Sequence, residues 1–162
     1  MKYVALASLS PEALTSGIYE AVFRYQLDHG DPNIPRTPRG SRYKAYYLAI
    51  VKDEFDIAGD GIPPDEYIKD PNATFIERFQ GISPIAKNFS QCKKTNSGVT
   101  DNTTGLPGVL LLVGKVRWVS KTEVAVDAGY YFQSLCAAGQ VFHLVWADGK
   151  FHVTTVDQPW TS

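Results

Sequence analysis

Alternating apolar and polar positions dominate the last third of the chain, from Val109 to Ser162. This segment is rich in Val, Leu, Phe, Tyr and Trp, residues that are typical of half-buried strands. Turn residues interrupt it at 120–122, at Ala138-Gly139 and at Asp148-Gly149. An Asp-Gly pair favours a two-residue type I′ hairpin, because both central positions need a positive φ. The pattern therefore predicts a meander of four antiparallel strands.

The expected turns determine which residues of neighbouring strands face each other. The predicted pairs are Trp118–Val124, Val116–Val126, Lys115–Asp127, Trp146–Phe151, Leu144–Val153, Val145–His152 and His143–Thr154. Strict alternation across Ala138-Gly139 would move the apolar set to the wrong face, so we expect a bulge at or within two residues of Gly129. The expected core face then holds Val116, Trp118, Val124, Val126, Leu135, Phe142, Leu144, Trp146, Phe151 and Val153.

A long helix is predicted from Pro11 to His29. Ser10 is suited to cap it, Pro11 to occupy its first position and Glu12 to interact with its dipole. Apolar residues recur at helical spacing: Leu14, Ile18, Tyr19, Ala21, Val22, Phe23, Tyr25 and Leu27. We expect this stripe to pack on the sheet face that carries Trp118, Leu144 and Trp146, because a helix must bury its apolar stripe.

The middle of the chain is less regular. Residues 43–51 read as a strand that is apolar on both faces, and 74–80 as a short helix with Phe75 and Phe79 on its buried side. The proline- and arginine-rich segment 31–42 reads as a surface loop. Residues 53–70 hold seven acids and are expected to form an exposed excursion, and 81–108 an irregular connection.

The order of these elements resembles the NTF2-like and cystatin-like α+β rolls. The C-terminal segments that carry the resemblance to uncharacterised bacterial proteins of this kind are 118–120, 129–131, 137–139, 148–153 and 160–162. The resemblance implies one α+β domain over residues 1–162. In it a curved antiparallel sheet, made of the four-strand meander and one earlier strand, packs on the N-terminal helix and can enclose a conical pocket. Such rolls host enzymes and binding modules alike.

Composition narrows the classes of function. The chain has 162 residues, 44% hydrophobic and 20% charged, with a net charge of −1, which argues against nucleic-acid binding. No apolar run approaches the ~20 residues of a membrane span. Residues 1–9 faintly resemble a signal peptide but are read as mature chain. The compartment stays open: periplasmic or secreted if a leader has been removed, otherwise cytoplasmic.

Two cysteines, Cys92 and Cys136, lack metal-ligand spacing. They are either two separate thiols or one bridge between the central loop and the sheet.

Candidate chemistry elsewhere is sparse. The stretch 56–61 resembles the start of a calcium loop, but Ala58 and Tyr67 occupy positions that need oxygen ligands, so we interpret it as a solvated acidic loop. His143 and His152 lie on neighbouring strands, on the face opposite the expected core, without a third ligand. No phosphate loop, nucleophile elbow or zinc motif occurs, and we expect no cofactor, metal or catalytic residue.

Two hypotheses of function remain. The first is a non-catalytic binding or interaction module for a protein partner or a small apolar ligand, with a homodimer left open. The second is a pocketed-roll enzyme of the isomerase or hydratase type, which needs an ionisable group inside the cone. The expected ligand contacts, in the mouth between the first helix and the sheet, are Tyr25, Tyr47, Tyr131 and Trp160, which combine apolar area with a hydrogen-bond donor.

Overall fold

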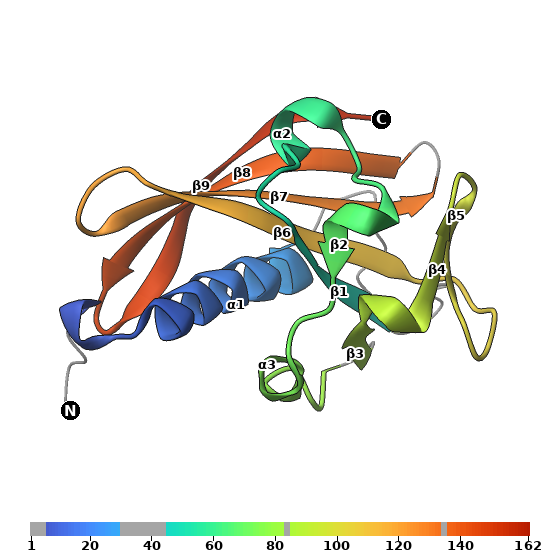
Figure 1. Cartoon of the computed structure of the whole chain (residues 1–162), viewed down its shortest axis with the longest axis horizontal. Coiled ribbons are helices and arrows are strands. Elements are labelled where there is room, and N and C mark those ends of the chain that lie inside the picture. The colour runs from blue at the N-terminus through green and yellow to red at the C-terminus, as the bar shows by residue number, and fades with distance from the viewer. Residues whose placement is uncertain (1–5, 30–44, 83–84, 134–135) are drawn as a thin grey trace.

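The computed structural model describes residues 6–29, 45–82, 85–133 and 136–162 (Figure 1). Its helices are α1 (Pro11–His29), α2 (Ile57–Asp60) and α3 (Ala73–Glu77), and its 3-10 turns are η1 (Leu6–Ser8), η2 (Asp65–Tyr67) and η3 (Phe89–Gln91). Its strands are β1 (Ala45–Val51), β2 (Ile68–Lys69), β3 (Ile85–Asn88), β4 (Cys92–Thr95), β5 (Gly98–Asp101), β6 (Val109–Trp118), β7 (Glu123–Gln133), β8 (Cys136–Ala147) and β9 (Lys150–Thr161).

The described strands form a mixed sheet of seven and a separate two-stranded sheet, so the α+β class predicted from the sequence is confirmed. The main sheet has the order β2-β1-β6-β7-β8-β9. The short β3 also pairs with β1, in parallel, as does β6. The four C-terminal strands form the predicted antiparallel meander. Beyond the meander the sheet has three strands, β1, β2 and β3, where the sequence predicted one.

Helix α1 lies across one face of the main sheet, as Figure 1 shows. The Ser10 hydroxyl accepts a hydrogen bond from Ala13 N at 3.1 Å, which confirms the predicted cap. Ile18, Val22 and Phe23 of the helix are fully buried in one core with Leu144 of β8. Trp146 packs at the edge of this core. The predicted helix face and sheet face therefore meet.

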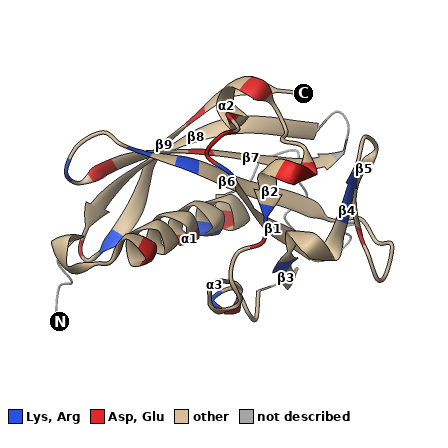
Figure 2. Cartoon of the chain, in the orientation of Figure 1, with Lys and Arg blue, Asp and Glu red and all other residues tan. Residues whose placement is uncertain are grey.

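The opposite face of the sheet is covered as well, by α2 and the β4–β5 hairpin (Figure 1). Its core contains Tyr47, Leu110 and Leu112, together with Ile57 from α2 and Val99 from β5. The prediction of an exposed excursion over 53–70 was therefore wrong in part, because Ile57 is fully buried. Helix α2 and the turn η2 carry exposed acids (Figure 2), whereas Asp53 lines a pocket with Tyr19 of α1.

The helix-capping and strand assignments of the middle region differ in detail from the sequence prediction. Asp56, which begins the calcium-like stretch, caps α2 by accepting a hydrogen bond from Gly59 N at 3.1 Å. Asn72 caps α3 by accepting a hydrogen bond from Phe75 N at 2.8 Å, and Phe75 and Phe79 are buried as expected. The segment 81–108 is less irregular than predicted, since it contains β3, β4 and β5.

Most of the predicted register is confirmed. The observed pairs include Trp118–Val124, Val116–Val126, Trp146–Phe151, Leu144–Val153 and Val145–His152. Asp148 and Gly149 both have a positive φ, 55° and 78°, as a type I′ turn requires. His143 pairs with Thr155 instead of Thr154, because the β8–β9 register shifts between His143 and Leu144. Trp118 shares the helix-side face but remains 48% exposed.

The predicted bulge at Gly129 was wrong. Ala138 and Gly139 are not a turn but lie inside β8, and β7 pairs with β8 without interruption from Glu123 to Tyr131. The parity conflict that required the bulge therefore does not exist. Register shifts occur instead between Val113 and Val116 of β6 and after Tyr131 of β7. Leu135, a predicted core residue, is outside the described residues.

The shift in β6 also changes a predicted charge pair. Gly114 and Lys115 together stand opposite the single residue Asp127, so Lys115 does not face it as expected. Arg117 forms the ion pair with Asp127 instead, with Arg117 Nη2 2.7 Å from Asp127 Oδ1.

Gly139 is the position where the fold most clearly needs glycine. A Cβ there would collide with Trp160 Nε1 and lie 2.7 Å from the Ile57 carbonyl oxygen. Trp160 Nε1 donates to that same carbonyl at 2.8 Å, which fastens α2 to the sheet. The absence of a side chain at Gly139 therefore allows the contact.

We expect Gly139→Ala to lower the free energy of unfolding by about 1–3 kcal/mol, because overpacking displaces Trp160 and α2. Urea unfolding followed by Trp fluorescence measures it. Gly17→Ala is the matched control, since its Cβ would lie 3.8 Å from Phe151 in ordinary contact and alanine favours the helix. Equal stability of Gly139→Ala and the native chain would contradict the packing described.

Candidate functional site

An open groove of about 630 Å³ runs along one flank of α1, between the helix and the β8–β9 hairpin. Ala13, Gly17 and Ala21 lie on its helix wall at intervals of four residues, followed by Tyr25. Residues four apart share one face of a helix, so three small side chains in a row leave space beside it. The small residues are the reason why the groove exists on this flank.

The other wall of the groove is aromatic. Trp146 of β8 and Phe151 of β9 pack edge to face with ring centroids 4.9 Å apart, and Val153 continues the wall. The ring of Trp118, in β6, also packs on Phe151, with the ring centroids 6.3 Å apart. The Asp-Gly turn sets the register that puts Trp146 opposite Phe151, so the aromatic wall follows directly from the sequence.

Charged side chains stand at the rim. Glu20 and Arg24 form an ion pair, with Arg24 Nε 3.4 Å from Glu20 Oε2. Arg24 also donates a hydrogen bond to the Arg78 carbonyl at 2.9 Å. Asp28 and Lys150 also line the groove, and neither takes part in an ion pair among the described residues. The groove therefore combines an apolar floor with one acid and one base that can meet a ligand.

The structure does not bring the four sequence-predicted ligand contacts together. Tyr25 lies on the α1 side, stacked on His29 at 4.2 Å, and lines the groove. Tyr47, Tyr131 and Trp160 lie in the core on the opposite face of the sheet. Tyr131 donates to the Thr95 carbonyl, and Trp160 donates to Ile57. Three of the four residues therefore bind parts of their own chain in this structure.

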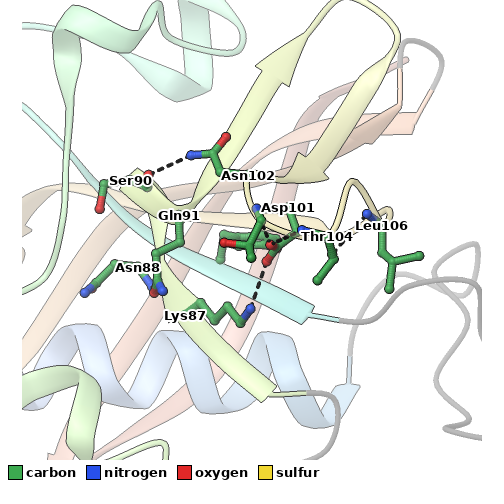
Figure 3. Close-up of polar contacts among 10 residues, drawn as sticks. Lys87, Asn88, Ser90, Gln91, Asp101, Asn102, Thr104 and Leu106 are labelled. Carbon is green, nitrogen blue, oxygen red and sulfur yellow. Dashed lines mark hydrogen bonds and ion pairs between the residues drawn. The ribbon is translucent and has the colours of Figure 1, made fainter.

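Tyr47 belongs to a polar cluster centred on Asp101. Figure 3 shows Asp101 with Lys87 and Thr104 of this cluster. The Tyr47 hydroxyl donates to Asp101 Oδ2 at 2.6 Å, and Lys87 Nζ lies 2.8 Å from the same oxygen. The backbone amides of Thr103 and Thr104 donate to Oδ1 at 2.8 and 3.1 Å. All four donors come from the protein itself, so this cluster fastens the β4–β5 hairpin to the sheet.

Electrostatics in this cluster follow from its geometry. The hydrogen bonds from Lys87, Tyr47 and the two amides hold the pKa of Asp101 well below its usual range. Burial and the Asp101 carboxylate raise the pKa of Tyr47 above its usual value. Neither shift points to a group prepared for proton transfer near neutral pH, because Asp101 stays ionised and Tyr47 stays protonated.

A second buried polar group lies under the C-terminal half of α1. Gln26 is 6% exposed, and its Nε2 donates to the Gly129 carbonyl at 3.1 Å and to Gln140 Oε1 at 3.4 Å. Gln140 in turn donates to Gln158 at 3.3 Å. The sequence prediction missed Gln26, since a lone glutamine beside an apolar stripe gives no signal of burial.

The two histidines considered as a pair have separate partners. His143 Nε2 donates to Asp157 Oδ2 at 2.9 Å, and His152 Nε2 donates to the Ala147 carbonyl at 3.0 Å. Among the described residues no group of three or more His, Cys, Asp or Glu side chains is arranged to hold a metal ion. In the same part of the chain no helix is long and apolar enough to cross a membrane.

Cys92 and Cys136 form no disulfide. Cys92 is buried in the core on the α2 side of the sheet, and Cys136 packs against the core on the α1 side. Of the two alternatives left by the sequence, the structure therefore has two separate thiols. Burial, followed by nearby carboxylates, raises the pKa of Cys92 to about 12.

Comparison with protein-family models, with curated proteins and with solved structures found no match to this chain. The resemblance to NTF2-like and cystatin-like rolls therefore stays a prediction.

Asp101→Asn should flatten the dependence of stability on pH. Because the folded pKa is lowered, the carboxylate's stabilisation is present above the unfolded pKa of about 3.9 and is lost as pH falls toward the folded pKa. Urea unfolding from neutral to strongly acidic pH measures this, with the more exposed Asp65→Asn as control. Parallel curves for the native chain and Asp101→Asn would contradict the assigned pKa.

We expect Cys92 to resist alkylation in the folded protein. A thiol with a pKa of about 12 holds little thiolate at neutral pH, and the side chain is also shielded. Iodoacetamide should modify the half-buried Cys136 first in the folded protein, as peptide mass spectrometry can measure. In urea without reductant it should modify both thiols. Protection of both cysteines in unreduced urea would show a disulfide and contradict the structure.

Proposed function

We propose that this chain is a non-catalytic binding module that holds its ligand in the groove between α1 and the β8–β9 hairpin. The observation that carries the proposal is the groove itself, with small residues on the helix wall and Trp146 and Phe151 on the other. Its volume of about 630 Å³ is in the range that small-molecule sites occupy, roughly 300–1,000 Å³. Aromatic walls with a few charged groups at the rim are typical of such sites.

The packing under α1 favours binding over catalysis. In a pocketed roll the space between helix and sheet would be hollow, but here Ile18, Val22 and Phe23 fill it. The buried charged residues in the described chain are Asp101 and Asp127, and neither belongs to the core beneath α1. An isomerase or hydratase of the roll type would need a group in that space that exchanges a proton near neutral pH, whereas burial raises the pKa of Tyr19 there to about 12. The packing of α1 against one face of the main sheet also supports the proposed similarity to NTF2-like or cystatin-like rolls.

The chemistry of the groove limits what it can hold. The floor accepts an apolar or aromatic body, which can be a small ligand or the side chains of a protein partner. Asp28 and Lys150 offer one charge of each sign. The net charge of −1 argues against nucleic acid as the ligand, because nucleic-acid binding depends on a strong excess of basic residues.

A screen of small aromatic and aliphatic fragments by ¹H–¹⁵N NMR tests the proposal. We expect shift changes to cluster at Gly17, Ala21, Trp146 and Phe151, because these residues line the groove. Ala21→Arg should weaken binding at least tenfold by filling the groove (about 1.4 kcal/mol).

Thr15→Arg is the matched control, since Thr15 is exposed on the opposite flank of α1 and the change adds the same positive charge to the same helix as Ala21→Arg. Fragments that bind Ala21→Arg as well as the native chain, or that map to the α2 face, would contradict the proposal. Thermal unfolding of both variants establishes that each is folded.

A further inference from the structure

Strand β9 forms a long edge of the main sheet. It has twelve residues and is the last strand in the sheet order, whereas the other edge is made by β2 and β3, of two and four residues. An edge strand presents a row of backbone N–H and C=O groups that can pair with another chain, and proteins protect such rows by shortening, bulges, proline or charged side chains. The β2–β3 edge is short, but β9 is not.

Apart from the charge of Lys150, the features that protect the β9 edge begin at its fifth residue. The register with β8 shifts between His143 and Leu144, which places the irregularity at Thr154, and shifts again beside Gln158. Pro159 has no N–H to offer a partner. The first four residues, from Lys150 to Val153, pair regularly with β8. These four residues therefore keep a regular edge.

The regular part of the edge and the groove coincide. Lys150 and Val153 mark the ends of the only β9 segment that lines the groove, and α1 forms the facing wall. A strand added to this edge would point every second side chain toward α1, since side chains alternate along a strand. Backbone pairing would then supply affinity and the groove would select side chains, as in other cases of strand addition beside a helix.

We propose that the ligand of this groove is an extended peptide segment of a partner protein, added to β9 at Lys150–Val153 with its alternate apolar side chains in the groove. This inference rests on the proposed function and specifies its ligand.

The charges of Asp28 and Lys150 at the rim favour one order of acidic and basic residues in the bound peptide. Lys150 lies at the end of the groove beside the hairpin turn, next to Phe151, which faces Gly17. Asp28 lies eleven residues after Gly17 in α1, which is about 16 Å along the helix at 1.5 Å per residue. An extended peptide covers this distance with about five residues. A segment with an acid near Lys150 and a base some five or six residues away would meet both charges.

Selection from a displayed library of random nine-residue peptides tests the inference, with the full chain as bait and Ala21→Arg for counter-selection. We expect enriched peptides with alternating apolar residues flanked by an acid and a base. The double variant Asp28→Lys with Lys150→Glu should reverse the order of these charges in the selected sequences. Neither change touches the core, because both side chains lie at the rim.

Backbone methylation of one selected peptide separates strand addition from simple apolar contact. Methyl groups on every second amide should reduce affinity at least tenfold in one register and leave it nearly unchanged in the other, because only one set of amides pairs with the edge. Equal tolerance of both registers would overturn the inference, as would the absence of enriched peptides.

The outcomes also distinguish this inference from the proposed function. Fragments that bind in the groove while no peptide is enriched would retain the binding module and reject the peptide ligand. A dimer in analytical ultracentrifugation that is lost in Ala21→Arg and retained in Thr15→Arg would show that a second copy covers the edge, and would reject a foreign segment. Peptides that bind both variants equally would reject the site itself.

Discussion

The main sheet must be covered on both faces, because its central strands are apolar on both. In β1, Tyr46 and Leu48 point toward α1, whereas Tyr47 and Val51 point to the other side. In β6, neighbouring leucines alternate between the two cores in the same way. A sheet of this kind cannot leave one face in water without exposing large apolar side chains. The arrangement of the rest of the chain follows from this constraint.

Each cover uses a different means. Helix α1 covers one face with its own apolar stripe, and the Ser10 hydroxyl caps its first turn. The other cover is made of short pieces, so polar contacts fasten it: Asp101 holds the β4–β5 hairpin and Trp160 holds α2. With both faces covered, the flank of α1 and the edge strand β9 are the surfaces on which we propose binding. The proposed peptide site lies where those two surfaces meet.

The sequence predicted the elements with strong local signals. Helix α1 and the Asp148-Gly149 hairpin were placed correctly, because a cap, a stripe and a type I′ turn each depend on neighbouring residues. Ala138-Gly139 resembled a turn, but Gly139 is required by Trp160, a contact that depends on the whole fold. Ile57 gave no signal among the acids around it, so the cover of the second face was missed.

The candidate site was predictable only in part. Tyr25 was correctly assigned to the helix, and the register gave the aromatic wall of the groove. Tyr47 and Tyr131 were assigned to the mouth of a roll, but strand alternation points each to the face away from α1. The small residues Ala13, Gly17 and Ala21 were visible in the sequence, yet a groove arises only when a specific strand lies beside them. That neighbour is set by the tertiary fold.

Among the described residues, β9 has a regular edge beside the groove with no strand paired to it, and native-state hydrogen exchange of the amides of β8 and β9 tests this directly. In dilute protein, the account predicts that amides of Lys150–Val153 alternate between slow exchange, where they bond to β8, and fast exchange, where they face outward. The amides of β8, which has a strand on each side, should be slow throughout its centre. Uniformly slow exchange along Lys150–Val153 would contradict the account, since it would mean that the edge is already paired.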